Sequence, residues 1–317
     1  MFSPDPDPLE VELLVVPDAT LMLVAALIEP LRAANRVLGR PQFGWRITTP
    51  DGVPAPTQAG IPIPSAGRFE ARGTAPLLVV ASYNWQASAV PGLISRLSAA
   101  GRARPLVAGI ESGAWLIARA GLLDGRRATT HWEDFEDFAT AHPEVRTEAR
   151  RFVIDGARVT TGGAGPALEL MLTLIRRRLG YALSLEVARL FVTEQASRED
   201  EAPALALARP QDAAVARAVA AMEAHLDEPL PIERVARIAG ISARHLQTRF
   251  RRVFGVGPHA HYRALRLARA RRLLIETEAP VFEVALRTGF SGPGALARAY
   301  ARAHGETPGE TRRRARL

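Results

Sequence analysis

Residues 232–250 read IERVARIAGISARHLQTRF, and residues 281–300 repeat this pattern as VFEVALRTGFSGPGALARAY. Six positions recur after 49 residues, since Ile232, Val235, Ala236, Gly240, Ile241 and Ser242 correspond to Val281, Val284, Ala285, Gly289, Phe290 and Ser291. After one inserted residue, Leu246, Phe250, Gly255 and Pro258 recur at a spacing of 50 as Leu296, Tyr300, Gly305 and Pro308. Each copy predicts a short helix, a glycine-containing turn and a second helix, which is a helix-turn-helix unit.

A long basic helix is expected between the two copies, over residues 261–277. Its apolar positions, Leu265, Ala268, Leu273 and Leu274, are expected to face inward, and Arg266, Arg269, Arg271 and Arg272 are expected to face solvent or phosphate. A single helical hairpin with a glycine turn is common outside DNA-binding proteins. Two such units in tandem, joined by a basic helix, favour a DNA-binding module over a helical dimerisation module.

The distribution of charge supports that interpretation. All 41 basic residues of the 317-residue chain are arginine. Residues 211–317 hold 19 of these arginines and 10 acidic residues, a net charge of +9, whereas residues 1–210 have a net charge of −1. A basic terminal third beside a neutral body is typical of a nucleic-acid-binding module joined to another domain, and scattered arginine in a basic proteome would not predict this asymmetry.

The composition excludes several classes of protein. With 47% hydrophobic and 23% charged residues, the chain can build ordinary cores and does not belong to the disordered class. It contains no cysteine, which excludes disulfides, thiolate metal sites and a cysteine nucleophile. No apolar run reaches the roughly 18 residues of a membrane span, and residues 1–10 do not resemble a signal peptide. We therefore expect a cytoplasmic protein without membrane association.

The first part of the chain alternates short apolar strands with helical patterns. Strands are predicted at 11–16, 45–49, 77–81 and 106–110, with helices at 20–37, 91–100 and 113–120. Asp155-Gly156 predicts a hairpin turn between strands at 152–154 and 158–161, and a helix of about a dozen residues follows the glycine-rich stretch 162–166. This alternation predicts an α/β domain with a mostly parallel, flavodoxin-like sheet between helices over residues 1–195. A linker over 196–211 and an all-α domain over 212–317 are expected to follow.

The repeat and its flanking helices resemble the DNA-binding domain of the AraC/XylS family of bacterial transcription regulators. In that family, the second helix of each unit enters the major groove. The resemblance implies that Arg244, Gln247 and Thr248, with His245 nearby, read bases in the first copy. Arg249, Arg251 and Arg252 are expected to be phosphate contacts or solvated charges rather than base readers. The second copy departs from the family pattern, because Pro293, Gly294 and Ala295 replace polar readers. Arg298 and Arg302 are therefore expected to contact mainly the DNA backbone, about 10 bp from the first contact.

The strand at 106–110 ends in a tight turn, Gly109-Ile110-Glu111-Ser112-Gly113-Ala114, that runs directly into a helix. This pattern predicts a nucleophile elbow, which presents one side chain at the carboxyl edge of the sheet. Together with residues 29–35, 120–132 and 161–163, it resembles the glutamine-amidotransferase-like superfamily that includes the PfpI proteases. Catalytic members have cysteine at the elbow, and here the residue is Glu111, which cannot replace a thiolate nucleophile. No catalytic residue, metal or cofactor is therefore predicted.

The combination of the two domains resembles the GlxA-like subgroup of AraC regulators. Some members with an acidic elbow residue resemble regulators of carnitine, glycine-betaine or arginine catabolism, which implies a small-molecule effector. An acidic side chain and aromatic rings would suit a cationic amine. The predicted ligand-binding residues are Glu111, Glu29, His131, Trp85 and Trp115, and Tyr83 and Trp132 could add further ring faces. The alternatives are core packing for the aromatic residues and His131, structural hydrogen bonding for Glu29, and a solvent-facing carboxylate at a helix N-terminus for Glu111.

We therefore expect a sequence-specific regulator that binds double-stranded promoter or operator DNA. Its first domain would sense a small amine, betaine or amino-acid metabolite and form a homodimer, and the effector would move the DNA-binding domains so that RNA polymerase is recruited. Activation is the commoner outcome in the family. One alternative is a constitutive regulator whose first domain only dimerises. Another is an amidase or hydratase with an accessory DNA-binding domain, although the elbow offers it no nucleophile.

Overall fold

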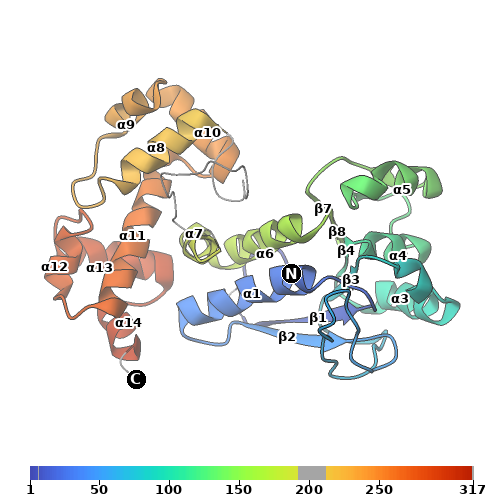
Figure 1. The fold of residues 1–317 in the computed structure, drawn as a ribbon. Helices are drawn as coiled ribbons and strands as arrows, with labels where there is room; N and C mark the ends of the chain where they lie inside the picture. Colours follow the sequence, from blue (N-terminus) through green and yellow to red (C-terminus); the bar gives the residue numbers. More distant parts are fainter. Residues whose placement is uncertain (6, 192–211, 316–317) are drawn as a thin grey trace. The chain divides into compact units, whose positions relative to one another are not determined.

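The computed structural model describes residues 1–5, 7–191 and 212–315, which divide into two compact units, Met1–Arg178 and Leu179–Leu317. The first unit contains a six-stranded sheet in the order β2-β1-β3-β4-β8-β7 (Figure 1). The strands are β1 (Leu9–Val15), β2 (Phe43–Thr48), β3 (Leu77–Ala81), β4 (Val107–Glu111), β7 (Phe152–Asp155) and β8 (Arg158–Thr161). All neighbouring strands are parallel except β7 and β8, which pair antiparallel around the Asp155-Gly156 turn. The predicted mostly parallel α/β sheet is confirmed.

The sheet is covered on both faces, because every residue of the central strand β3 is buried. One face packs against α3 (Pro91–Ala103) and α4 (Gly113–Arg119), which contribute Leu93, Leu97, Leu116 and Ile117 to a shared core. The other long helices of the unit are α1 (Leu21–Leu38) and α6 (Ala164–Leu179). Shorter elements complete it: α2 (Trp85–Ser88), α5 (Phe135–Ala141), a 3₁₀ turn (Trp132–Asp134) and the small sheet of β5 (Arg127–Ala128) and β6 (Arg146–Thr147).

The second unit is entirely helical in the part that the structure describes. It consists of α7 (Tyr181–Arg189), α8 (Ala213–Glu223), α9 (Ile232–Ala239), α10 (Ala243–Phe254), α11 (Pro258–Glu276), α12 (Val281–Leu286), α13 (Pro293–His304) and α14 (Pro308–Ala315) (Figure 1). The two predicted helix-turn-helix units are α9–α10 and α12–α13. Their turns use Gly240 (φ 75°) and Gly289 (φ 68°), both in the left-handed region that favours glycine.

Each helix-turn-helix unit has its own core, built from corresponding positions of the repeat. Val235 and Phe250 are fully buried in the first core, and Val284 and Tyr300 are fully buried in the second. The helix α11 lies between them, with Leu265 in the first core and Leu273 and Leu274 in the second. The repeat therefore reflects two packed units on one connecting helix.

Two arginines of α11 differ from the prediction that they face solvent or phosphate. Arg266 donates to the carbonyl oxygens of Thr288 and Gly289, which lie at the turn of the second helix-turn-helix, and its guanidinium lies 4.2 Å from the ring centroid of Phe290. Arg271 is 4% exposed and forms ion pairs with Glu186 and Glu306. The prediction was wrong because helical periodicity cannot reveal carboxylates and carbonyls that other helices bring to the inner face.

The helix α7 groups with the second unit, although the predicted domain boundary at residue 195 assigned it to the first domain. Gly180, with φ 93°, separates it from α6. Leu185 of α7 packs against the core of the first helix-turn-helix unit, and Arg189 donates to Glu223 of α8 at 3.0 Å. The predicted linker, 196–211, lies outside the described residues, and the functional boundaries stay a prediction. In the described ranges, no helix is both long and apolar enough to cross a membrane.

Candidate DNA-binding helices and effector site

The elbow predicted after β4 is present and depends on two glycines. A Cβ on Gly109 would lie 2.7 Å from backbone atoms of Ala114, and a Cβ on Gly113 would lie 2.0 Å from the carbonyl oxygen of Val79. The turn therefore brings α4 closer to the sheet than any side chain at these two positions allows. Glu111 stands between them with φ 55°. Such a backbone is uncommon for a residue with a Cβ, and strain of this kind occurs preferentially at functional sites.

Residues from three other segments lie near the Glu111 side chain. Its Oε2 atom lies 3.5 Å from the position that a Cβ on Gly163 would take, and His131 Cδ2 lies at the same distance from that position. Burial raises the pKa of Glu111, and hydrogen bonding to Ser82 and the charge of His131 oppose this shift only partly. Burial also raises the pKa of Asp134, which faces the same histidine. The two predicted residues Glu111 and His131 are thus brought together.

The arrangement around Glu111 is acidic on balance. The negative charges of Asp134 and Glu133 both raise the pKa of Glu111. Nδ1 of His131 lies 3.5 Å from Glu133 Oε2. Ser82, Asp134 and Gly163 were not predicted as site residues. Ser82 follows β3 and Gly163 follows β8, so the sheet order could have placed both at the edge that holds Glu111, whereas Asp134 lies in the 3₁₀ turn directly after His131. In the described ranges, no group of three or more His, Asp or Glu side chains could hold a metal ion.

The other three predicted ligand-binding residues lie differently. Glu29 pairs with Arg32 near the middle of α1, with 41% of its side chain exposed. The first turn of α1, not its middle, lies at the carboxyl edge of the sheet, because the backbone N–H of Thr20 donates to Ser82. Glu29 is eight residues beyond the start of the helix, roughly 12 Å along its axis. The structure therefore does not bring Glu29 to Glu111.

Trp85 and Trp115 are buried and pack against each other. Their rings are stacked with centroids 5.0 Å apart, and the guanidinium of Arg119 lies 4.6 Å from the centroid of the Trp85 ring. Trp115 also meets Phe138 edge-on. This arrangement corresponds to the core-packing alternative and covers the ring faces that a cation would need. Tyr83 and Trp132, in contrast, are 63% and 76% exposed.

The first two turns of α10 present most of the predicted base-reading side chains to solvent. Ser242 begins the helix, and its hydroxyl accepts a hydrogen bond from the backbone N–H of His245. Arg244, His245 and Thr248 are exposed. Gln247 lies differently: its side-chain amide packs over Gly257, where a Cβ would be 2.7 Å from Nε2. Its amide is therefore turned toward the start of α11.

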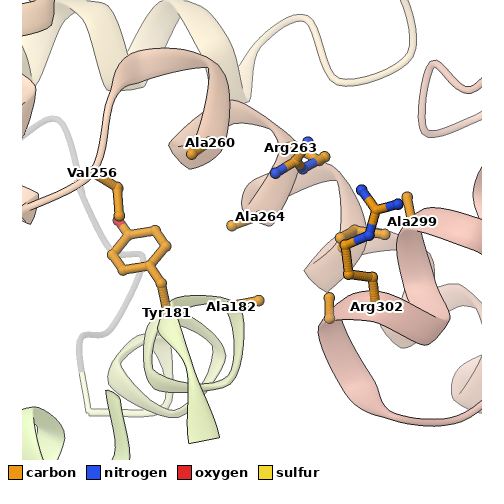
Figure 2. A pocket seen from close by; sticks show the side chains of 10 residues that line it. Tyr181, Ala182, Val256, Ala260, Arg263, Ala264, Ala299 and Arg302 are labelled. Carbon is orange, nitrogen blue, oxygen red and sulfur yellow. The ribbon is translucent and has the colours of Figure 1, made fainter. Parts of the chain in front are cut away.

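Four further arginines of the second helices have three kinds of environment. Arg249 and Arg252 form ion pairs with Asp212, at 2.8 and 3.0 Å. Arg298 is exposed in the middle of α13, with Nη1 3.5 Å from the position of a Cβ on Gly294. Arg302 lines a pocket of about 160 Å³ together with Arg263 and alanines of α7, α11 and α13. Figure 2 shows the two arginine side chains beside this pocket, opposite Tyr181.

Comparison with known proteins agrees with this architecture. Residues 235–314 match the model of a helix-turn-helix domain, and residues 89–177 match the DJ-1/PfpI family. The HTH-type transcriptional regulator GlxA of Rhizobium meliloti is 35% identical over 310 residues, which cover 95% of this chain and 94% of that protein. The chain belongs to the GlxA-like AraC-family transcriptional regulators. The predicted family is thereby confirmed.

Other members of the family are similar over most of their length. The HTH-type transcriptional regulator CdhR of Pseudomonas aeruginosa is 31% identical over 94% of this chain and 90% of its own, and GbdR of the same species is 31% identical over 96% and 84%. A solved AraC family transcriptional regulator from Pseudomonas putida matches 58% of this chain with a TM-score of 0.51 and 24% identity, which supports the fold. The protein is thus a DNA-binding transcriptional regulator with a DJ-1/PfpI-like domain.

Proposed function

We propose that this GlxA-like regulator responds to a small cationic metabolite, such as an amine, a betaine or a basic amino acid, that binds beside Glu111. The carrying observation is the strained, partly buried position of Glu111 at the elbow. A carboxylate held in an unfavourable backbone conformation and away from water costs free energy, and positions with such strain cluster at functional sites. A cationic ligand would compensate the buried charge.

The charge around the elbow supports this class of ligand. Glu133 and Asp134 add to the negative potential of Glu111, and the charge of His131 acts in the opposite direction. The exposed rings of Tyr83 and Trp132 lie next in sequence to Ser82 and His131 and offer free faces for a quaternary ammonium. The proposed site therefore consists of Glu111, His131, Tyr83 and Trp132. Trp85, Trp115 and Glu29 are left out because other side chains already engage them.

We further propose that the first unit has no enzymatic activity. The elbow residue must attack an acyl carbon in the catalytic members of the superfamily, and a carboxylate is a poor nucleophile and a good leaving group in that reaction. Ser112 is buried, and its backbone N–H donates to the carbonyl oxygen of Ala81. Because Ser112 lies one residue after the elbow position, its hydroxyl is not presented at the sheet edge as the side chain of the elbow residue is.

DNA recognition is proposed to rest on α10, with Arg244, His245 and Thr248 reading base edges and Arg298 contacting the backbone from α13. Exposed side chains in the N-terminal part of a recognition helix are the ones that reach base edges in the major groove. In this proposal the protein is a cytoplasmic homodimer, and effector binding changes the placement of its DNA-binding units so that RNA polymerase is recruited and transcription is activated. The relatives GlxA, CdhR and GbdR are named as regulators, which is consistent with this role.

A thermal-shift titration tests the effector site. Glycine betaine, carnitine and arginine, each compared with an uncharged analogue of similar size, would be added to the wild type and to the Glu111→Gln and Glu29→Gln variants. A ligand at 100 times its dissociation constant stabilises the native state by about 2.7 kcal/mol. We expect stabilisation of the wild type and of Glu29→Gln, but not of Glu111→Gln. Stabilisation of all three proteins by the same cation would place the site elsewhere.

The alternative without a sensor has a separate outcome. If the first unit only dimerises, none of these cations shifts the melting temperature, and DNA affinity is the same with and without each compound. Binding of DNA would then persist, so failure of the effector proposal is distinguishable from failure of DNA recognition. Loss of specific binding in an Arg244→Ala variant checks the latter.

A further inference from the structure

Asp212 holds two arginines of the first recognition helix. Its Oδ1 atom accepts from Arg249 Nη1 at 2.8 Å, and its Oδ2 atom accepts from Arg252 Nη2 at 3.0 Å. The Asp212 side chain is 7% exposed, whereas 41% of the Arg249 side chain and 70% of the Arg252 side chain are exposed. One inward-facing carboxylate thus bridges two guanidinium groups that reach the surface.

Asp212 is also the N-cap of α8. Its Oδ1 atom accepts from the backbone N–H groups of Ala214 and Val215 at 3.2 and 3.4 Å. These bonds hold the carboxylate in place independently of the arginines. Burial alone would raise the pKa of Asp212, but the hydrogen bonds from Arg249 and Val215 outweigh it, so its pKa lies below the ordinary value. The carboxylate is therefore fixed and ionised at neutral pH.

A carboxylate between two arginines resembles the contact that arginines make with a DNA phosphate, since both anions offer oxygens to guanidinium N–H groups. Arg249 and Arg252 belong to α10, whose first two turns carry the exposed side chains Arg244, His245 and Thr248. Asp212, Arg249 and Arg252 together have a net charge of +1, whereas the two arginines alone would have a net charge of +2. A phosphate that approaches these arginines meets an anion already bound to them.

The second repeat provides an internal contrast. At the spacing of 50, Arg252 corresponds to Arg302 in α13, and Arg249 corresponds to Ala299. No ion pair joins Arg302 to a carboxylate in the part of the chain that the structure describes. Asp212 therefore pairs with the copy that retains polar base-reading residues. Among the described residues, no carboxylate pairs in the same way with Arg302 of the other copy.

We propose that Asp212 is a built-in competitor of DNA phosphate that lowers the affinity of the first recognition helix for DNA. In the free protein, Asp212 forms ion pairs with Arg249 and Arg252. On DNA, a phosphate that approaches the exposed sides of these arginines competes with Asp212 for them. The effect is independent of base sequence, because phosphate contacts position a protein without reading bases. Asp212 thereby sets how far binding depends on correct base contacts made by the rest of α10. This inference rests on DNA binding by α10.

The test compares Asp212→Asn with the wild type in DNA-binding titrations at several salt concentrations. Asparagine caps helices about as well as aspartate, so the variant removes the charge and keeps the cap. Asp227→Asn is the matched control, since it makes the same change of net charge at an exposed loop of the same unit, and Asp227 forms no ion pair with an arginine among the described residues. The DNA would be a site selected from random sequences by the wild type, together with a scrambled duplex of the same length.

We expect Asp212→Asn to bind both duplexes more tightly than the wild type, with a salt slope steeper by about 0.9 for one additional phosphate. Its advantage should shrink by roughly 3- to 4-fold between 50 and 200 mM salt, since that slope acts over a fourfold change in concentration. Asp227→Asn should retain the slope of the wild type. An Arg252→Ala substitution should reduce DNA affinity by a larger factor in the Asp212→Asn background than in the wild type.

Several results would overturn the proposal. Weaker DNA binding by Asp212→Asn would mean that the carboxylate orients the arginines for DNA. An equal gain from Asp227→Asn would mean that net charge alone is responsible, and an unchanged slope would mean that no phosphate contact is released. If Asp212→Asn lowers the melting temperature, Asp212→Ser, which retains a capping hydroxyl, repeats the measurement with the same expected outcome.

Discussion

Arg271 Nε lies 3.1 Å from Glu186 Oε1, which joins α11 to α7 through a buried ion pair. The same guanidinium approaches Glu306 Oε1 at 3.2 Å through Nη1 and donates to the hydroxyl of Tyr300. Only 5% of the Arg271 side chain is exposed. Three segments that are far apart in sequence therefore meet at one arginine, and their packing depends on it.

Replacing Arg271 with alanine should destabilise the second unit strongly. Removing one partner of a buried ion pair leaves the other charge without compensation, which typically costs about 3–5 kcal/mol. The free energy of unfolding can be measured by chemical denaturation of the full chain. Arg272→Ala is the control, because Arg272 is its exposed neighbour on the same helix. Equal losses from both substitutions would show that the ion pairs contribute little beyond helix propensity.

The second unit should become less stable as the pH falls below 6.5. Burial lowers the pKa of His261 and of His304 to about 4, so each folded histidine binds its proton less readily than the unfolded one. Their contribution is complete above the unfolded pKa near 6.5 and is lost as the pH falls toward 4, by up to about 3 kcal/mol for each group. Glu186 acts in the opposite direction, because burial raises its pKa to about 7.

The His304→Gln variant should therefore show a weaker pH dependence than the wild type between pH 6.5 and 4. His304 is a suitable position because its ring packs on Tyr300, with centroids 4.3 Å apart, and contacts no other histidine. Glu186→Gln should do the reverse and make the loss of stability in acid steeper. Parallel stability curves for the wild type and both variants would contradict the assignment of these groups.

Replacing Glu111 with glycine should stabilise the first unit while it removes the response to ligand. Glycine adopts a φ of 55° without strain, and relief of a left-handed residue with a Cβ is worth of order 1 kcal/mol. Asn84→Gly is the matched control, since Asn84 has φ 53° and contacts Asp18 rather than Glu111. A Glu111→Gly protein that is less stable than the wild type would indicate that the Glu111 side chain has a structural role.

Arg244 and Gln247 should differ in their contributions to specific DNA binding. Arg244 is exposed on the first turn of α10, and a good contact to a base is worth about 1–3 kcal/mol. Gln247 packs over Gly257, so Gln247→Ala should cost clearly less than Arg244→Ala. Affinity for a selected site relative to scrambled DNA measures this contribution. A larger loss for Gln247→Ala would mean that its amide leaves Gly257 and reads a base in the complex.

Periodic patterns predicted much of the backbone. The strand at 77–81 and the paired strands around Asp155-Gly156 lie close to their predicted places, because buried strands and turn residues have local signatures. The helix of α6 runs for 16 residues instead of a dozen, since its arginines continue the helix after the apolar pattern weakens. The helix-turn-helix repeat was also predictable, because its core positions recur at a fixed spacing.

Side-chain partners across distant segments were not predictable in this way. The stacking of Trp85 on Trp115, the covering of Arg271 and the pairing of Arg249 with Asp212 all depend on which helices pack together. Asp212 before the apolar residues of α8 was recognisable as an N-cap, but its arginine partners lie 37 and 40 residues further along the chain. The elbow was different, because Gly109 and Gly113 on either side of Glu111 are a local signature of a tight turn.

The division of the chain between Arg178 and Leu179 has a consequence for building hybrid regulators. Both α7 and α8, which stand before and after residues 192–211, belong to the second unit, so the chain passes from one unit to the other once, next to Gly180. A hybrid that receives its first unit from another family member should be joined at this glycine, so that Glu186 keeps its native arginine. A junction within residues 192–211 would supply a foreign helix to α11 and leave Arg271 facing an unselected partner.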